Sequence, residues 1–483
     1  MIQAGFGKAS IWNSIRTERR AATPLEAAAF CVSSGKTTAV MVFTDMVNMR
    51  YSTSENIRKA VSRSLKIPKS ACAVFLTHNH AVPGDTAGNF NVALLSGACA
   101  RAARLAFAGK KPAEIAFVGF EPEKPLNFTR RIRYKDLGVL TFYNGHKDIG
   151  GKPDISHTLK IELMSFCKGT PPVQQHGFDV SGPLKSAYRV PEPPVKVKSP
   201  YFLGKPVDGL MQGIFFREPG SKKPIGSLLR FAAHAAASNV KGADFYSGDF
   251  PYFARREAER LFGGGSVFMT GPSGNLVPLL SRKSLKLAEK IGKQAARLIV
   301  KKADSARWEK IDGPVKPVSL KTIFRFRDDF PSKVSDRNRE MREIAGKALT
   351  GAKTGMPLKD IKKLTDRYEM LGYSKTYFDK GGMAVTKNPG GKIRWDIFAL
   401  RIGKYAILGL PGEPFGEYSV ILRSSTIGRR LITVELCNGH LSYFPMKKDY
   451  PLGSYEVNAA RCGPSNEKVL INSGLKALKK LGF

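Results

Sequence analysis

The sequence is poor in acidic residues. It has 40 Asp and Glu against 78 Lys and Arg in 483 residues, which gives a formal net charge of +38 at pH 7. Such a balance suits an anionic partner, for example nucleic acid, a phospholipid surface or an acidic substrate. The basic residues are spread over the whole chain, however, and no nucleic-acid-binding module can be recognised. General solubility therefore explains the charge better than a specific nucleic-acid partner, while an anionic small-molecule substrate remains open.

Long hydrophobic runs are also absent. No stretch approaches the roughly 18 consecutive apolar residues of an ordinary membrane span. The start of the chain, MIQAGFGKASIWNSIRTERR, lacks the apolar segment of roughly 7–15 residues that a secretory signal needs. We therefore expect a cytoplasmic protein without a membrane span. The 42% hydrophobic content still supports a full core, which excludes a disordered chain.

Cysteine is scarce and shows no metal-binding spacing. No two of the six cysteines form a C-x-x-C pair, and four of them sit inside apolar runs. Free thiols in the core are therefore expected, rather than disulfides or a zinc knuckle. The six are Cys31, Cys72, Cys99, Cys167, Cys437 and Cys462.

Strands and helices alternate in the first quarter of the chain. Short apolar runs end at turn signals, as buried strands do, and the segments between them have the apolar spacing of helices. This alternation predicts an α/β fold, with mixed β-sheets flanked by helices, in a single large catalytic domain over residues 1–483. The predicted strands are 39–46, 71–78 and 114–120, and the predicted helices are 54–66, with a Ser/Thr cap, and 91–107.

Two later segments interrupt this pattern. Residues 147–205 are rich in Pro, Gly and Lys and predict an inserted loop lobe. Residues 303–390 are basic and predict a mostly helical insertion. After them, RWDIFALRIGKYAILGL predicts a hairpin that turns at Gly403-Lys404.

Two of the seven histidines stand two positions apart in FLTHNHAVPG (75–84), where an apolar run stops. Because side chains on a strand alternate between faces, His78 and His80 should point to the same side. A pair of solvated loop histidines would give the same pattern. The alternative is a metal or acid–base site, since ligands of α/β sheets gather at the carboxyl ends of strands.

Other strand ends carry residues of the same kind. His234 ends the apolar run of RFAAHAAAS, and Glu413 follows YAILGLPG. A lone histidine on an apolar face is more often a satisfied core residue than a ligand. Together, however, histidines and a carboxylate from separate strand ends are the donors that a catalytic zinc centre needs. Spacing this wide does not by itself show that they converge.

Two familiar motifs are incomplete. SSGKTT (33–38) contains Gly-Lys-Thr, but a phosphate-binding loop needs a glycine where Phe30 stands, and the TAVMVF that overlaps and follows it is a strand. A hairpin turn fits this segment better. GPSGN lacks the glycine that a nucleophile elbow needs two residues after Ser273.

Five segments resemble, in order, the motifs of the neutral ceramidase superfamily. PLEAAAFCVSSGKTTAVMVFTDM is similar to its N-terminal strands, and THNHAVPGD to its Thr-His-Thr-His-Ser-Gly-Pro stretch. LLRFAAHAAA, with the later VFMTGPSGNLVP, is similar to its second histidine segment and the turn after it. LPGEPFGEYS resembles its metal-glutamate segment, and ELCNGHLSYFP with DYPLGSYE its tyrosine segment.

The resemblance implies a zinc hydrolase and assigns roles by position. The implied zinc ligands are His78, His234, Glu413 and Tyr443, the implied proton-transfer residue is His80, and the residues that hold the substrate carbonyl are Arg130 and Tyr455. Zinc brings the pKa of its water to about 7, so the implied reaction is attack of hydroxide on an acyl amide. Ester, lactone or glycosidic cleavage, or zinc binding without turnover, would use the same residues.

Three departures from the family argue against long-chain ceramide as the substrate. Val277 stands where the ceramidases have a serine. The family's C-terminal β-sandwich domain has no counterpart in the sequence, and neither does its secretion signal. We therefore expect a smaller and more soluble substrate.

Overall fold

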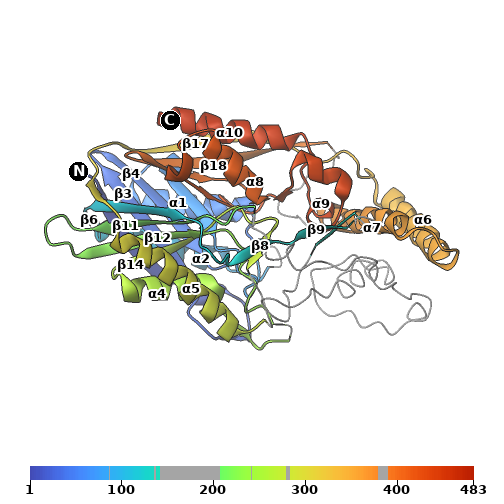
Figure 1. The fold of residues 1–483 in the computed structure, drawn as a ribbon, viewed down its shortest axis with the longest axis horizontal. Coiled ribbons are helices and arrows are strands. Elements are labelled where there is room, and N and C mark those ends of the chain that lie inside the picture. Colours follow the sequence, from blue (N-terminus) through green and yellow to red (C-terminus); the bar gives the residue numbers. More distant parts are fainter. Residues whose placement is uncertain (86–87, 135–137, 142–206, 241, 279–282, 379–389) are drawn as a thin grey trace.

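The computed structural model of the chain describes residues 1–85, 88–134, 138–141, 207–240, 242–278, 283–378 and 390–483 (Figure 1). Three sheets form its centre, and helices cover the outer face of each. The fold is α/β with mixed sheets flanked by helices, as predicted. The loop lobe predicted at 147–205, together with Cys167, lies outside the described residues.

The first sheet contains two of the predicted strands and leads to the His78 segment. Its strand order is β5-β4-β3-β1-β6, with β4 and β5 parallel. The turn between β3 and β4 lies at Gly35, so the Gly-Lys-Thr segment is a hairpin turn, as predicted. Helices α1 and α2 pack on its outer face. The bounds are β1 Gln3–Ser10, β3 Glu26–Ser34, β4 Thr37–Thr44, β5 Cys72–Leu76, β6 Lys111–Pro112, α1 Tyr51–Leu65 and α2 Val92–Ala108.

The second sheet leads to His234. Its order is β14-β12-β11-β7-β16, and only the β12–β14 pair is parallel. Helices α4 and α5 pack on its outer face and against each other. The bounds are β7 Glu114–Phe120, β11 Met211–Arg217, β12 Pro224–Phe231, β14 Gly265–Thr270, β16 Trp308–Lys310, α4 Asp249–Leu261 and α5 Leu285–Asp304.

The third sheet leads to Glu413. Its order is β17-β18-β19-β21, and the β18–β19 hairpin turns at Gly403-Lys404, as predicted. Helices α8 and α10 cover its outer face. The bounds are β17 Val315–Arg325, β18 Lys392–Ile402, β19 Tyr405–Gly409, β21 Leu431–Val434, α8 Gly416–Ser424 and α10 Asn466–Leu481.

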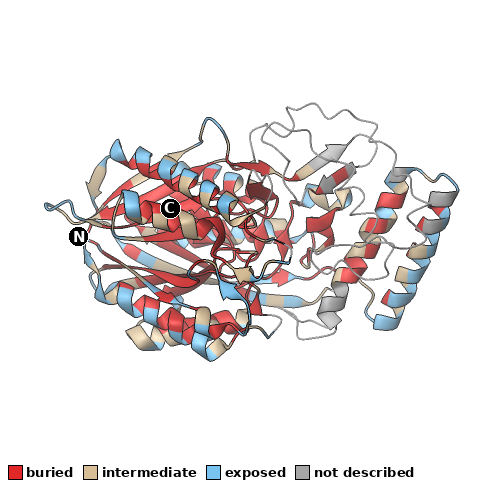
Figure 2. Cartoon of the chain, turned by 90° about the horizontal axis from the view of Figure 1, so that it is seen from below, coloured by how far each residue is buried: buried red, intermediate tan, exposed pale blue. Residues whose placement is uncertain are grey.

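One hydrophobic cluster joins the three sheets. It includes Phe30 from the first sheet, Phe216 and Met269 from the second, and Phe398 and Ile432 from the third, all fully buried. Figure 2 shows buried residues throughout the sheets and on the inner sides of the covering helices. The sheets are therefore packed against one another, and residues that follow strands of different sheets can meet in one site.

Two predicted features differ from the structure. The helix predicted at 54–66 begins at Tyr51, and its N-cap residue Arg50 makes no side-chain cap, so the expected Ser/Thr cap is not used. The segment 303–390 is not one helical insertion, because β16 and β17 occupy its first part and belong to the second and third sheets. Helices α6 (Val334–Lys353) and α7 (Leu358–Phe378) follow and project from one end of the molecule (Figure 1).

Short elements connect the sheets to the candidate site. Three strand pairs and one short helix carry or adjoin the residues singled out above. They are β8 (Asn127–Thr129) with β15 (Leu276–Pro278), β9 (Arg131–Tyr134) with β10 (Gly138–Thr141), β20 (Glu413–Pro414) with β22 (Tyr443–Phe444), and α9 (Tyr455–Asn458). A further pair joins β2 (Arg20–Ala21) to β13 (Phe245–Tyr246).

The bulk predictions on thiols and membrane spans can be checked on the described residues. Five of the six cysteines lie there, and all five are buried free thiols, as predicted. Among the described helices, none combines the length and apolar character needed to cross a bilayer.

Candidate metal centre

The His78 segment leaves the first sheet by a turn that the strand pattern does not predict. Strand β5 ends at Leu76, and His78 has a left-handed backbone with φ 57°, which is uncommon for a residue with a Cβ. Two backbone bonds hold the turn: Asn79 N donates to Met46 O at 3.1 Å, and His80 N donates to Ala235 O at 2.8 Å. The two histidines still meet, with 3.3 Å between the Nε2 atoms of His78 and His80. Their convergence is as predicted, but a turn rather than strand alternation causes it.

His234 reaches the same place from the second sheet. It lies three residues after β12, where its backbone N donates to Leu276 O at 3.2 Å. Its ring Nδ1 lies 2.9 Å from the same Leu276 oxygen, and the ring Nδ1 of His78 lies 3.0 Å from Val47 O. A carbonyl can only accept, so both rings carry their proton on Nδ1. In the neutral form of each ring, Nε2 therefore presents a lone pair to the centre.

Glu413 and Tyr443 come from the two paired short strands that follow the third sheet. They are register partners in the parallel β20–β22 pair. The Oε2 atom of Glu413 lies 3.2 Å from His78 Nε2 and 3.1 Å from His234 Nε2. The hydroxyl of Tyr443 lies 3.5 Å from His234 Nε2. The four residues assigned as zinc ligands from the resemblance are thus linked by contacts through Glu413 and His234.

The spacing of these donors fits a metal ion. Donors at about 2.0–2.1 Å from one tetrahedral ion lie about 3.3 Å from each other. The contacts that join His78, His234, Glu413 and Tyr443 span 3.1 to 3.5 Å. The ligand atoms of His78, His80 and His234 also lie within 4.8 Å of one another, which would suit a metal as well. Imidazole nitrogen with carboxylate oxygen is a donor set that zinc accepts.

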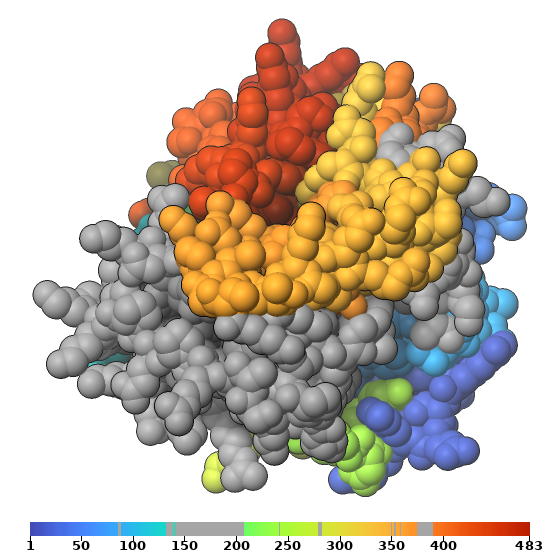
Figure 3. All heavy atoms as spheres, turned by 90° about the vertical axis from the view of Figure 1, so that its right-hand side faces the viewer, coloured from blue at the N-terminus to red at the C-terminus, as the bar shows by residue number. Residues whose placement is uncertain are grey.

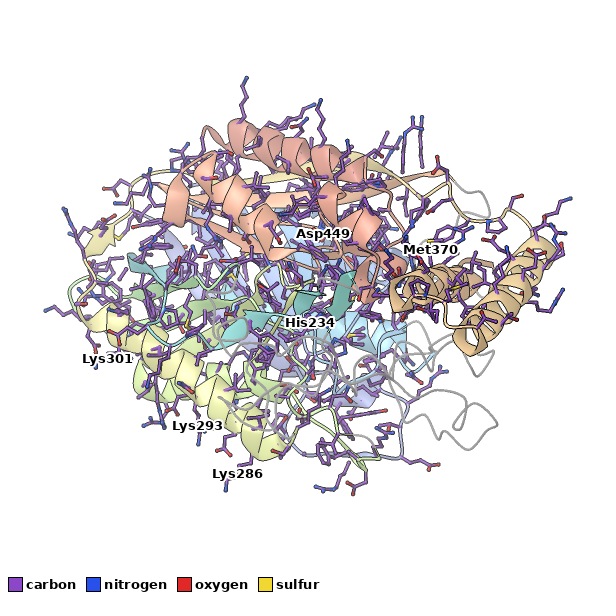
Figure 4. All side chains as sticks on the ribbon, turned by 45° about the vertical axis from the view of Figure 1, so that its right-hand side comes forward. His234, Lys286, Lys293, Lys301, Met370 and Asp449 are labelled. Carbon is purple, nitrogen blue, oxygen red and sulfur yellow. The ribbon has the colours of Figure 1, made fainter. Side chains whose placement is uncertain are left out.

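The centre is enclosed. The exposed fraction is 1% for His78 and His234 and 4% for Glu413, while His80 is only partly buried. Figure 4 shows His234 in the interior, whereas Lys286, Lys293 and Lys301 point outward from α5. Within the described part of the chain, no backbone carbonyl fixes the second ring nitrogen of His80. His80 is therefore the histidine with the most freedom to exchange a proton.

The protonation states favour metal binding for most of the set. Burial would raise the pKa of Glu413, but the surrounding histidines outweigh it and hold this pKa well below its usual range. Burial, followed by the charges of Arg130 and His78, lowers the pKa of His234 to about 4. Burial also holds the pKa of His80 well below its usual value. His78 is the exception, because the Glu413 carboxylate outweighs burial and raises its pKa.

The residues assigned to the substrate carbonyl lie beside Tyr443. Of two adjacent arginines, Arg130 faces the centre: its Nη2 donates to the Tyr443 hydroxyl at 3.3 Å, and its Nε donates to Glu456 at 2.7 Å. Arg131 contacts the other oxygen of Glu456 instead. The ring of Tyr455 lies 5.5 Å from that of Tyr443, between centroids. The structure thus brings together all seven residues that the resemblance singles out.

Sequence reasoning missed two polar residues that support this set. His440 Nε2 lies 2.6 Å from Glu413 Oε1 and holds the carboxylate from the side away from His78 and His234. Glu435 accepts hydrogen bonds of 2.7 Å from both N and Oγ of Ser273, and burial raises the pKa of Glu435 to about 8. The sequence contains an indication of each residue. His440 is one of only seven histidines and lies in NGHLSYFP, and Glu435 is an acidic residue inside the apolar run LITVELC.

A serine hydroxyl lies close to His234, although not at Val277. Val277 is buried on β15 and pairs with Phe128 of β8. Ser273, four residues earlier, places its Oγ 3.4 Å from His234 Nδ1. The valine therefore does not leave the surroundings of His234 without a hydroxyl.

Comparison with known proteins shows the fold and no close relative. No protein-family model matches the chain, and no curated protein matches it in sequence. The crystal structure of neutral ceramidase from Pseudomonas aeruginosa matches 99% of this chain and 75% of its own, with a TM-score of 0.60 and 16% identity. A ceramidase complexed with C2 matches the same shares, with a TM-score of 0.61 and 15% identity. The chain therefore has the fold of neutral ceramidases, as the resemblance predicted.

Proposed function

We propose that this chain is a zinc-dependent hydrolase of an acyl amide bond. The observation that carries the proposal is the contact of Glu413 Oε2 with the Nε2 atoms of His78 and His234, at 3.2 and 3.1 Å, with both rings oriented by backbone carbonyls. Histidine nitrogen and carboxylate oxygen are donors of catalytic zinc sites. The ceramidase fold supports amide hydrolysis as the reaction class.

Four residues would hold the metal: His78, His234, Glu413 and Tyr443. When bound, zinc supplies a Lewis acid and lowers the pKa of a water molecule to about 7. His440 keeps the Glu413 carboxylate in place through the 2.6 Å contact described above. Contacts of this kind orient metal ligands and raise metal affinity.

The remaining chemistry falls to residues around the ligands. His80 is neutral at pH 7 because burial lowers its pKa. It would accept a proton from the attacking water transiently and pass that proton to the leaving amine. Arg130 and the phenol of Tyr455 stabilise the negative charge that develops on the carbonyl oxygen. Burial opposes the charge of Arg130, but Glu456 outweighs burial and raises the pKa of Arg130, so this guanidinium stays cationic.

The substrate that fits this site best is a small soluble acyl amide with a negative charge near the amide. Lys283 lies half-buried just before α5, and its charge acts on both His80 and Arg130. Burial lowers its pKa, and the carboxylate of Asp249 only partly offsets this effect. Within the described residues no carboxylate forms a contact ion pair with it. A half-buried cation without a contact partner is stabilised when an anion binds beside it. The net charge of +38 would also attract anionic substrates.

Metal analysis and a substrate panel test the proposal together. Elemental analysis should find about one zinc per chain. The purified protein is then assayed on matched N-acyl amides, esters, lactones and glycosides, with neutral and anionic members, before and after treatment with chelator. Amide turnover that stops with chelator and returns with zinc is the expected result.

The panel also separates the other two functions that the site allows. Turnover of esters, lactones or glycosides alone would support the metal site, but it would show that the cleaved bond is not an amide. Zinc-loaded protein with no turnover of any member would make the chain a metal-binding protein with the ceramidase fold. Finding no zinc in protein prepared without chelator would overturn the metal centre itself.

Long-chain ceramide belongs in the same assay. We expect it to be cleaved weakly or not at all, and a short anionic N-acyl amide to be cleaved faster. Ceramide hydrolysis at a rate equal to that of a neutral ceramidase assayed alongside would contradict this choice of substrate. Faster ceramide turnover in Val277→Ser would show that this position tunes substrate choice.

A further inference from the structure

Helix α7 lies against the segment that carries Tyr455. It belongs to the helical pair α6–α7, which forms a band across one end of the molecule in Figure 3, below the C-terminal segments. It packs on α9, whose first residue is Tyr455. This helix belongs to the segment 303–390, which contains no motif with a recognisable function, so its contacts with the site need an explanation.

The backbone just before Tyr455 is in a conformation that usually requires glycine. Ser454 has φ 72° and ψ 170°, a region that costs of order 1–3 kcal/mol for a residue with a Cβ. Two contacts hold it there. Its backbone N donates to Asp366 Oδ1 on α7 at 3.1 Å, and its Oγ lies 2.8 Å from Thr141 Oγ1 on β10.

Helix α7 also holds the other end of α9. The side-chain amide of Asn458 donates to Asp366 Oδ1 at 3.0 Å and to Glu369 at 2.7 Å. Lys362, one turn earlier on α7, forms an ion pair with Asp366 at 2.8 Å. One carboxylate of α7 thus binds the residues on both sides of the Tyr455 turn.

Tyr373 makes the contact with Tyr455 itself. The phenols of Tyr373 and Tyr455 are hydrogen-bonded, and their rings meet edge to face with centroids 5.9 Å apart. Tyr455 is in turn hydrogen-bonded to Tyr443, with centroids 5.5 Å apart. Three tyrosines therefore form a row from α7 to the candidate metal centre.

We infer that α7 is part of the active site, with Tyr373 and Asp366 as positioning residues that set the orientation of the Tyr455 phenol. The role of Tyr455 on the carbonyl oxygen belongs to the proposed function, and the inference rests on it. Asp366 fixes the backbone of Tyr455, and Tyr373 fixes its hydroxyl. Because an oxyanion donor must be placed before charge develops, loss of either contact should slow the chemical step and leave substrate binding unchanged.

Kinetics of isosteric variants provide the first test. Tyr373→Phe and Asp366→Asn should lower kcat by roughly 3- to 10-fold with KM unchanged, which is the effect of one lost hydrogen bond. The double variant Tyr373→Phe/Tyr455→Phe should be no slower than Tyr455→Phe, because Tyr373 acts only through Tyr455. Losses that multiply in the double variant would overturn the inference.

A matched control separates positioning from packing. Tyr450 belongs to the same aromatic cluster, but its hydroxyl donates to Cys462 O at 2.6 Å and not to a site residue. Tyr450→Phe should lower the melting temperature as much as Tyr373→Phe does, with kcat unchanged. Equal loss of kcat in both variants would mean that Tyr373 only packs.

Two readouts do not need turnover. Butylphosphonate, a tetrahedral oxyanion, is titrated calorimetrically into the zinc-loaded protein, and both Tyr373→Phe and Tyr455→Phe should bind it roughly 3- to 10-fold more weakly than the parent protein. In a crystal structure of Tyr373→Phe the Tyr455 phenol should be displaced, while Tyr450→Phe leaves it in place. If no amide is hydrolysed but these two results hold, the proposed reaction fails and the positioning role stands. An unmoved Tyr455 with unchanged phosphonate affinity would overturn the inference.

Discussion

The two histidines of the Thr77–His80 segment differ in how their rings are held, and this difference predicts different roles. His78 is tied through Nδ1 to Val47 O and touches Glu413. His80 contacts the Nε2 of His78, and within the described residues neither a backbone carbonyl nor Glu413 holds its ring. His78→Ala should therefore lose both zinc and activity. His80→Ala should keep zinc and lose rate by roughly 10²–10⁴, as general acid–base residues do. Zinc content and kcat of the two variants decide this, and an empty site in His80→Ala would make His80 a ligand.

His440 gives a second prediction for a single residue. Its 2.6 Å contact with Glu413 Oε1 orients the carboxylate, so removing it should weaken metal binding rather than abolish it. We expect His440→Phe to lower zinc affinity by roughly 10- to 100-fold, the usual effect of losing a residue that orients a ligand. Competition with a chromophoric chelator measures the affinity. Unchanged affinity would show that His78 and His234 alone orient Glu413.

Part of the site could be read from single residues in the sequence, and part could not. His78, His80, His234 and Glu413 each follow an apolar run, and that position marked them before any motif was compared. The left-handed turn at His78 was not predictable, because backbone bonds to Met46 and Ala235 hold it and no local pattern encodes them. The contacts of His440 and Glu435 were not predictable either, because no local sequence pattern encodes them.

Among the elements, α2 shows how closely a helix approaches a sheet in this fold. It lies on β1 where β1 has glycines: a Cβ on Gly7 would meet Ala102 O at 2.4 Å and Ala106 N at 2.5 Å. These are backbone atoms and cannot move without shifting the helix. Gly7→Ala should therefore destabilise the protein by about 1–3 kcal/mol, as overpacked sites do.

A glycine on helix α2 itself is the control for this prediction. Gly97 is exposed, and a Cβ there would meet nothing within 4 Å. Gly97→Ala should stabilise the protein by about 0.5–1 kcal/mol, because alanine is the better helix former. Urea unfolding of both variants measures the two effects. A neutral Gly7→Ala would mean that α2 can slide on β1.

Asp208 links two elements through a buried ion pair. It lies 2.6 Å from Arg230 of β12 and 2.8 Å from Arg423 of α8. Burial would raise the pKa of Asp208, but the two arginines outweigh it and lower this pKa to about 2. Because the pKa is lower in the folded state, the pair stabilises the protein above about pH 4, and this contribution is lost as pH falls towards 2.

Asp208→Asn tests that sign. The substitution should lower the free energy of unfolding by about 3–5 kcal/mol at pH 7, because Arg230 is left buried without its charge partner. The variant's unfolding free energy should also fall less steeply than the parent's between pH 4 and 2. Asp244 is the control, since its ion pair with Arg20 is exposed, and Asp244→Asn should leave the pH profile close to that of the parent. Parallel pH profiles of Asp208→Asn and the parent would contradict the linkage.

The elements were predicted well where periodicity was clean and poorly at a sheet edge. The strand expected at 114–120 is β7, with the same bounds, and the helix expected at 91–107 is α2, shifted by one residue. Strand β17 was missed because it is the edge of the third sheet and contains Lys316, Pro317 and Lys321. Lysine and proline are typical of edges that must not pair with another chain, and they hide the alternation of a strand.

At the scale of the whole molecule the dominant feature is charge. The net charge is +38, and the excess positive charges repel one another in the folded state and destabilise the folded state. The Debye length falls from about 10 Å at 0.1 M salt to about 3 Å at 1 M, so added salt should screen this repulsion. We expect the melting temperature to rise between 20 mM and 500 mM sodium chloride. Sucrose at equal osmolality is the control, and a flat or falling salt series would show that the repulsion is already compensated.

The meeting of three sheets at one centre also bears on how the chain reaches its native state. His78, His234 and Glu413 follow strands of different sheets and are far apart in sequence, so the site does not exist until all three sheets have docked. Contacts of such long sequence separation form slowly, and chains of this size commonly pass through partly folded intermediates. Metal uptake should therefore be among the last events of folding. An intermediate in which only the first and second sheets have docked would have His78 and His234 in place but would lack Glu413.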